Sequence, residues 1–283
     1  MIRLVLALAG ALLLAACGEP EREWPEPKPA LWEMVSPEGR RGWLFGTIHS
    51  LPLEVRWRTP ALEGALANSG VLVVEVVDVG DTAKAESVFE RFARNESLAP
   101  LSQRVAPEDR ADFAAFLDRA GSGETDFATT DTWAAALMLA NRARQLEAGQ
   151  NVDRALVDVR SEVVGLESHA VQYALFDALP PEEQTDLLMA LARDTGGEAA
   201  RIEAWLTGDL AKLASEMEGT FLDQPALRQS LLVDRNAYFA ARIVEAIERG
   251  RAPFVAVGAG HMLGPGGLPA LLAARGYTVR RVQ

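Results

Sequence analysis

Runs of apolar residues bounded by turn residues mark the predicted strands, which lie near both ends of the chain and in its middle. Ala30–Ser36 and Trp43–Ile48 flank the turn sequence PEGRRG, a pattern that predicts an N-terminal β-hairpin. Val71–Val77 is a nearly continuous β-branched run, which is typical of a strand buried on both faces. Glu162–Leu166 predicts another short strand.

Helical patterns fill most of the remaining chain. A short helix is predicted over Leu62–Asn68. Residues 168–249 are also predicted to be helical, and they end in a long segment from Pro225 to Arg249. Between residues 82 and 160 the predicted helices are Thr82–Asn95, Pro107–Ala120, Trp133–Glu147 and Asp153–Ser161.

The C-terminal segment returns to strands. Phe254–Val257 predicts a strand, followed by a glycine-rich turn, a helix over Leu268–Arg275 and a last strand over Tyr277–Val282. Because strands come from both ends with helices between them, we expect an α/β (α+β) fold. Residues 30–283 would form a single domain, with a central mixed β-sheet and a large helical insertion at about 82–160.

The first residues have the form of a secretory signal. Leu4–Ala16 is uncharged and follows Arg3, and its 13 residues span roughly 20 Å as a helix, short of a hydrocarbon core of about 30 Å. Leu14-Ala-Ala-Cys17 resembles the bacterial lipobox, in which the cysteine is lipidated and becomes the mature N-terminus. The alternative is an ordinary signal peptide, cleaved near Ala16, that leaves a spare thiol. We predict a signal peptide over 1–16 and a lipid on Cys17.

Residues 17–29 predict a tether. The sequence GEPEREWPEPKP, which follows Cys17, is rich in Pro and Glu and predicts an extended, solvated segment. Gly18 stands where an Asp commonly retains such lipoproteins at the inner membrane. We therefore expect attachment to the outer membrane through the lipid anchor, with the domain facing the periplasm.

Composition narrows the classes of function. The chain has 28 Lys and Arg against 40 Asp and Glu, a formal charge of −12 without a basic run, which argues against nucleic acid as a partner. The apolar content of 49% is ample for a packed core. A single cysteine excludes an internal disulfide and a cysteine-based zinc cage.

Two histidines stand in the same local frame. Gly46-Thr-Ile-His49 and Gly258-Ala-Gly-His261 each follow an apolar predicted strand. Both histidines would lie just past the carboxyl end of their strand, where α/β sheets place their sites. If both strands belong to one sheet, the imidazoles could converge on one crevice; the alternative is a separate surface or core role for each.

Acidic and basic side chains interrupt apolar patterns elsewhere. Glu75 lies inside a buried strand, where a carboxylate is costly unless it is paired, bound to a cation or able to reach solvent. Glu167 ends the next strand, and His169, two residues on, is predicted to lie at the surface. Arg235 and Asn236 share the apolar face of their helix, so Arg235 either snorkels or meets a buried acid or bound anion.

In order along the chain, five segments resemble the TraB/GumN family, also called TraB/PrgY/GumN, and the resemblance extends from about Ala30 to the C-terminus. The segments are GWLFGTIHSLP (42–52), VLVVEVVD (71–78), GLES with Gln172 following (165–172), Arg235–Asn236 and VGAGHMLGPGGLPALLAARGYTVRRV (257–282). The family includes the animal Tiki proteins, described as metal-dependent proteases favouring manganese or cobalt. It is similar in fold to erythromycin-esterase-like proteins and to haem-binding ChaN-type lipoproteins.

The resemblance implies a metal-binding and catalytic set of His49, Glu75 and His261, with Glu167, Arg235 and Asn236 as supporting site residues. Two imidazoles and a carboxylate form a mixed N/O donor set suited to Zn²⁺, Mn²⁺, Co²⁺ or Fe²⁺. The predicted function is metal-dependent hydrolysis of a peptide or similar acyl bond, with one glutamate as ligand and the other as base. The alternatives are a non-catalytic lipoprotein that binds haem or metal, and a peptide-binding interaction or signalling module.

Overall fold

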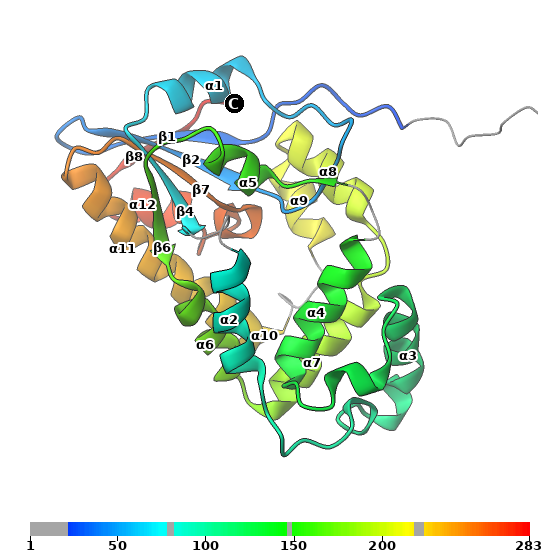
Figure 1. The fold of residues 1–283 in the computed structure, drawn as a ribbon. Coiled ribbons are helices and arrows are strands. Elements are labelled where there is room, and N and C mark those ends of the chain that lie inside the picture. Colours follow the sequence, from blue (N-terminus) through cyan, green and yellow to red (C-terminus); the bar gives the residue numbers. More distant parts are fainter. Residues whose placement is uncertain (1–21, 78–81, 146–148, 218–223) are drawn as a thin grey trace, which may run out of the picture.

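A six-stranded sheet with strands from both ends of the chain forms one side of the molecule (Figure 1). The computed structural model describes residues 22–77, 82–145, 149–217 and 224–283. The strands of the sheet are β1 (Leu31–Val35), β2 (Arg41–Thr47), β4 (Val71–Val76), β6 (Val163–Glu167), β7 (Pro253–Gly258) and β8 (Thr278–Arg281). Their order across the sheet is β6-β4-β7-β2-β1-β8, which confirms the predicted mixed α/β fold.

Four neighbouring strands run in the same direction. The pairs β2–β7, β7–β4 and β4–β6 are parallel, whereas β1 is antiparallel to both β2 and β8. Thr47 therefore lies opposite Gly258, and Val76 lies opposite Glu167. The carboxyl ends of β2, β7, β4 and β6 thus meet along one border, which we call the carboxyl edge.

Helices make up most of the rest of the chain. They are α1 (Pro60–Ala67), α2 (Thr82–Ala93), α3 (Arg110–Arg119), α4 (Thr132–Gln145), α5 (Val152–Val157), α6 (His169–Asp177), α7 (Pro181–Arg193), α8 (Glu198–Thr207), α9 (Leu210–Glu216), α10 (Pro225–Arg228), α11 (Asp234–Glu248) and α12 (Leu268–Ala274). A two-stranded sheet pairs β3 (Leu51–Pro52) with β5 (Gly149–Gln150). One π-helical turn, Gln229–Val233, leads directly into α11.

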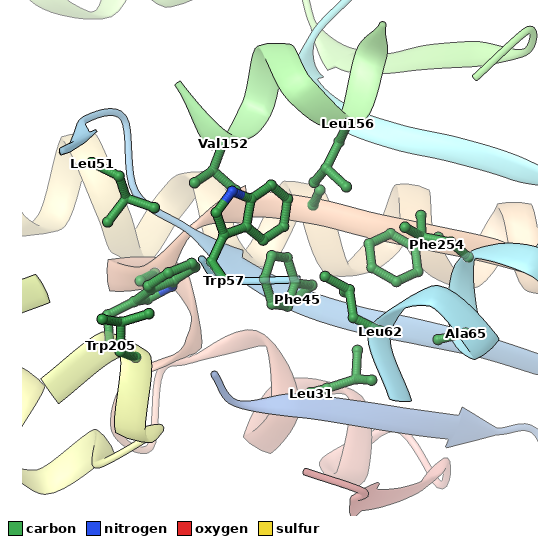
Figure 2. Packing of buried hydrophobic residues seen from close by; sticks show 14 of the residues in the cluster. Leu31, Phe45, Leu51, Trp57, Leu62, Ala65, Val152, Leu156, Trp205 and Phe254 are labelled. Carbon is green, nitrogen blue, oxygen red and sulfur yellow. The ribbon is translucent and has the colours of Figure 1, made fainter. Parts of the chain in front are cut away.

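Both faces of the sheet are covered, which explains the unbroken apolar run of β4. Val71 and Val73 pack on the side of α11 and α12, against residues such as Phe239. Leu72 and Val74 face the opposite side, where α1, α5 and α8 supply the cover. Figure 2 shows the centre of that second layer, in which Trp57 and Trp205 pack around Phe45.

A second core lies within the helices of the middle region, away from the sheet (Figure 1). It is built around the fully buried Trp133 of α4 and includes side chains of α2, α3, α6 and α7. These helices come from both sides of β6 in the sequence, so the chain leaves the helical region to form β6 and then returns to it. The division of the chain into a leader, a tether and one domain stays a prediction.

Most predicted elements are present, with three informative differences. The helix expected over Asp153–Ser161 ends at Val157, and it begins at Val152 because Asn151 caps it. The helix expected from Pro225 to Arg249 contains the π-helical turn. The β3–β5 pair has two residues in each strand, too few to produce a period that sequence analysis could detect.

The predicted leader and Cys17 lie outside the described residues. From Arg22 onward the predicted tether lies along the domain: Arg22 pairs with Glu203 at 2.6 Å, and Trp24 packs against the sheet core. Arg22, Glu23, Glu26 and Lys28 are exposed, whereas the Trp24 indole buries apolar surface against the domain. Among the described residues, no helix has the length and apolar character needed to cross a membrane.

Candidate active site at the carboxyl edge

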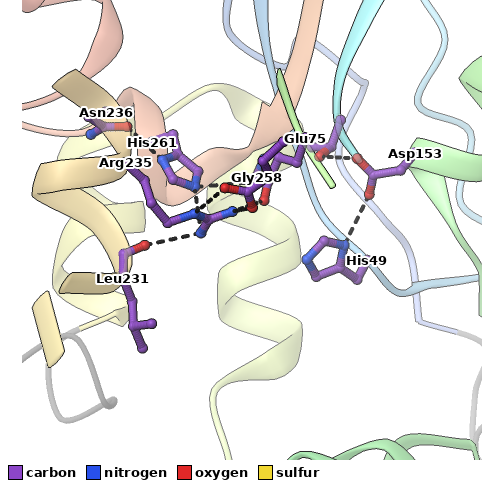
Figure 3. A network of polar contacts seen from close by, with 10 residues as sticks. His49, Glu75, Asp153, Leu231, Arg235, Asn236, Gly258 and His261 are labelled. Atoms are coloured by element: carbon purple, nitrogen blue, oxygen red, sulfur yellow. Dashed lines mark hydrogen bonds and ion pairs between the residues drawn. The ribbon is translucent and has the colours of Figure 1, made fainter. Parts of the chain in front are cut away.

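Five of the predicted site residues lie in one polar network at the carboxyl edge. Figure 3 labels four of them: Glu75, Arg235, Asn236 and His261. Glu75 is the fifth residue of β4, and Glu167 is the last residue of β6. His261 lies on a short 3₁₀ turn, Ala259–Met262, that follows β7. Arg235 and Asn236 come from the first turn of α11, which packs across the sheet.

Arg235 binds both carboxylates with the same nitrogen. Its Nη2 donates to Oε2 of Glu75 and to Oε1 of Glu167, each at 2.6 Å, and its Nε donates to Oε2 of Glu167 at 3.3 Å. The side chains of Arg235, Glu75 and Glu167 are 12%, 18% and 2% exposed. A buried arginine therefore compensates the carboxylate that interrupts β4.

The second oxygen of Glu75 faces the turn after β7. Its Oε1 accepts the backbone N–H of Gly258 at 2.8 Å and lies 3.6 Å from Nε2 of His261. A Cβ at position 258 would stand 3.2 Å from this oxygen, so the glycine lets the carboxylate approach the backbone closely. Burial alone would raise the pKa of Glu75, but His261, Arg235 and the Gly258 N–H outweigh it and lower the pKa to about 2.

Glu167 titrates in the opposite direction. Burial raises the pKa of Glu167, and the nearby charge of Glu75 adds to the rise, although the hydrogen bonds from Arg235 oppose it. Two carboxylates on one guanidinium thus have pKa values that move apart. Such separation is how sites obtain an ionised group and a proton carrier side by side.

Asn236 fixes the tautomer of His261. The Oδ1 of Asn236 lies 2.6 Å from Nδ1 of the imidazole, and its Nδ2 donates to the carbonyl oxygen of Gly266 at 2.8 Å. Because the amide group must present its oxygen, the ring proton of His261 belongs on Nδ1. Burial and Arg235 lower the pKa of His261 to about 4, against the attraction of Glu75. Its unprotonated Nε2 faces Glu75 and lies 3.4 Å from Nη1 of Arg235.

His49 lies across Glu75 from His261 and is held in the same way (Figure 3). Its Nδ1 is 3.0 Å from Oδ2 of Asp153, whose Oδ1 accepts the hydroxyl of Thr47 at 2.6 Å. The carboxylate places the neutral ring's proton on Nδ1 and leaves Nε2 unprotonated. The His49 side chain is 67% exposed, and the charge of its protonated form lowers the pKa values of Glu75 and His261. The edge therefore joins an exposed imidazole to a buried one.

Asp153 is the site residue that sequence analysis missed. It lies in the first turn of α5, where an acidic residue is common, so the sequence pattern gave no sign that Asp153 contacts a histidine.

The prediction that His169 lies at the surface is wrong for its ring nitrogens, both of which are buried. Tyr173 stands one helical turn further along α6 and stacks on that ring at 5.7 Å.

The donor types suit a metal, but their arrangement does not. Two unprotonated imidazole nitrogens and a carboxylate are the expected chemistry, and each Nδ1 has the oxygen partner that metal-binding histidines use. Arg235, however, donates to Glu75 and touches Nε2 of His261, so a positive charge already lies where a metal ion would bind. In the described part of the chain, no three His, Cys, Asp or Glu side chains are grouped closely enough to hold an ion.

The fold and this network define the class: an α/β protein with a histidine, glutamate and arginine site where parallel strands end. The TraB/PrgY/gumN family model matches residues 30–281, and the chain belongs to that family. No curated protein and no solved structure matches the chain significantly.

Proposed function

We propose that the protein hydrolyses an acyl bond, in a peptide or a similar substrate, at the carboxyl edge. One observation carries the proposal: both imidazoles have Nδ1 held by an oxygen, which leaves Nε2 as the basic nitrogen of each ring, and both histidines lie near enough to Glu75 to influence its pKa. Neutral imidazoles held in one tautomer are suited to take a proton from water.

In the proposed reaction, water is the nucleophile and His49 is the general base. The His49 side chain is 67% exposed, so water and substrate can reach this imidazole. The water oxygen bonds to the carbonyl carbon while His49 takes a proton, and the carbonyl electron pair moves onto oxygen. The bond to the leaving group then breaks, and the leaving group takes the proton from His49. Asp153 stabilises the imidazolium, in the manner of the acid in a catalytic triad.

Arg235 is the proposed stabiliser of the oxyanion. Its Nη2 and Nε are bound to carboxylates, whereas Nη1 donates to the carbonyl oxygen of Leu231 at 3.1 Å and lies 3.4 Å from Nε2 of His261. The 3.4 Å contact between Nη1 and Nε2 of His261 is the longer of the two. A developing oxyanion can replace this contact at the least cost in free energy. In this proposal Glu167 positions Arg235, and Asn236 positions His261.

A divalent metal is the competing form of the same site. Manganese, cobalt, zinc or iron would take His49, Glu75 and His261 as ligands, after Arg235 had withdrawn from Glu75. Metal content of the purified protein, and activity after chelation, separate the two forms. Stoichiometric metal together with loss of activity on chelation would support the metal form, whereas full activity without metal would support the reaction described above.

The test of the proposal is hydrolysis by the purified protein of quenched fluorescent peptides and chromogenic esters. We expect His49→Ala and His261→Ala to lower the rate by about 10²–10⁴-fold while circular dichroism shows that both variants are folded. Folded variants with unchanged rates would overturn it. A protein that hydrolyses nothing but develops a Soret band with haem, or captures partners equally well with His49→Ala, would support a non-catalytic module instead.

We also propose that the protein is an envelope lipoprotein, on the strength of the apolar leader and Cys17 alone. Metabolic labelling with a fatty acid should mark the wild-type chain and leave Cys17→Ser unlabelled. Fractionation should then place the labelled protein with the outer membrane. Labelling that persists in Cys17→Ser would overturn the lipid site, and inner-membrane fractionation would overturn the location inferred from Gly18.

A further inference from the structure

An open cavity of about 840 Å³ lies between α2 and α4, and Tyr173 of α6 contributes to its lining. Figure 1 shows α2 and α4 facing one another on the side of the sheet where β4 ends. The helix α6 begins two residues after Glu167, and α2 is the helix that follows β4 in the chain. Two of the three helices that line the cavity, α2 and α6, are therefore the helices that follow the strands carrying Glu75 and Glu167.

The walls combine aromatic rings with acidic groups. Phe89 and Tyr173 meet nearly edge to face, with ring centroids 5.2 Å apart and planes at 79°, and so form a corner. Glu86 and Glu90, one helical turn apart on α2, line the cavity together with Phe89. Met138 of α4 adds apolar surface across the cavity.

The cavity lining carries two negative charges, Glu86 and Glu90, and one positive charge, Arg94. Glu86 and Glu90 are exposed and make no ion pair within the residues that the structure describes. Arg94, the cation at the far end of the cavity, is bound to Glu96 at 2.6 Å. Two like charges one helical turn apart repel each other. Apolar ring surface beside carboxylates suits a long cationic side chain, because the rings can cover its aliphatic stem while the carboxylates attract its charged head.

The length of the cavity suits an extended chain. Its lining runs along α2 from Ala85 in the first turn to Arg94 just after the last, a rise of about 14 Å. An extended peptide covers this distance with about four residues. The cavity therefore has room for several residues of an extended peptide along α2.

We infer that this cavity binds a basic side chain, lysine or arginine, of a peptide substrate. The aliphatic stem would lie against Phe89, Tyr173 and Met138, and the charged head would lie between Glu86 and Glu90. The inference rests on the proposed hydrolase function for its substrate, but the binding itself requires no turnover.

The experiment measures calorimetric binding of N-acetyl-arginine amide and of N-acetyl-citrulline amide, a neutral probe of nearly the same shape. The wild-type protein should bind the arginine probe about fivefold or more tightly than the citrulline probe, and added salt should reduce the difference. The double variant Glu86→Gln/Glu90→Gln should lose the preference. The matched control Glu182→Gln/Glu183→Gln, which removes the same charge from α7, should keep it.

Equal binding of the two probes, or binding of neither, would overturn the inference, as would a preference that survives in Glu86→Gln/Glu90→Gln. His49→Ala and His261→Ala should bind the arginine probe as the wild type does, since neither histidine lines the cavity. Loss of binding in these folded variants would place the cation elsewhere. A cavity that binds arginine in a protein without hydrolytic activity would refute the proposed function while leaving the cation site intact.

Discussion

Glu75 and Glu167 accept hydrogen bonds from the same nitrogen of Arg235, at 2.6 Å each, yet their pKa values move in opposite directions. Burial would raise the pKa of both groups. Glu75 has His261 and the Gly258 N–H as additional partners, whereas Glu167 depends on Arg235 alone to oppose burial. One guanidinium thus holds two carboxylates of different proton affinity, and the network depends on it.

Removing Arg235 should be costly to stability. Arg235→Met leaves two buried carboxylates without their cation, and we expect the free energy of unfolding to fall by about 3–5 kcal/mol. Urea denaturation measures the change. Arg242→Met is the matched control, because Arg242 lies on the same helix in an exposed ion pair with Glu245, and its loss should cost less than about 1 kcal/mol. Equal losses in the two variants would contradict the role given to Arg235.

His261 should make the protein sensitive to mild acid. Burial lowers the pKa of His261 from 6.5 to about 4, so between these pH values the unfolded chain binds a proton that the native protein does not. The free energy of unfolding should therefore fall as the pH falls from 6.5 to 4, by about 3 kcal/mol in total. The lowered pKa of Glu75 continues the loss at lower pH, from 4.5 to about 2.

Urea denaturation at a series of pH values checks this, with His261→Gln as the comparison. The variant should show a shallower decline between pH 6.5 and 4. The raised pKa of Glu167 acts in the opposite direction just above its ordinary value, but it is present in both proteins. Parallel declines would show that the proton is taken up elsewhere.

Sequence patterns predicted the main strands of the sheet, and they predicted that the site residues meet if those strands belong to one sheet. Gly-x-x-His follows two apolar strands, β2 and β7, and Glu75 lies inside another apolar strand, β4. In the structure these three strands are parallel neighbours. Their carboxyl ends then fall on one border, so His49, Glu75 and His261 are brought to it from distant parts of the chain. The apolar face around Arg235 correctly indicated either snorkelling or a buried partner.

Contacts that depend on short or ordinary elements escaped prediction. Asp153 has no unusual sequence context, and the two-residue strands beside α5 are too short to produce a pattern. The partner of Arg235 could not be predicted from the sequence either. The apolar helix face around Arg235 indicated a buried acid or a bound anion and did not decide between them. In the structure Arg235 binds two acids, Glu75 and Glu167. Its contact with Glu75 also places a positive charge where the expected metal ion would bind.

Asn236 should control which ring nitrogen of His261 carries the proton. In Asn236→Ala the Nδ1–H loses its acceptor, and an unsatisfied buried donor costs about 1–3 kcal/mol. We expect ¹⁵N chemical shifts of the imidazole to report a change in the tautomer population, together with a lower midpoint of denaturation. Asn68→Ala is the control, since Asn68 also donates to a glycine carbonyl but is exposed. An unchanged tautomer would mean that another group orients the ring.

Asp153 should act on catalysis through His49. Asp153→Asn retains the size of the side chain but can present its amide N–H to Nδ1, which would then favour the tautomer with the proton on Nε2. The proposed base would lose its lone pair, so we expect kcat to fall by about 10²–10⁴-fold with little change in KM. The pH dependence of the remaining activity should shift, because the imidazolium has lost its carboxylate.

The control is Asp158→Asn. Asp158 lies at the end of the same helix in an exposed ion pair with Arg154, and its substitution should leave kcat and KM unchanged. A variant that alters KM alone, with kcat and its pH profile intact, would assign Asp153 to binding and remove His49 from the role of base.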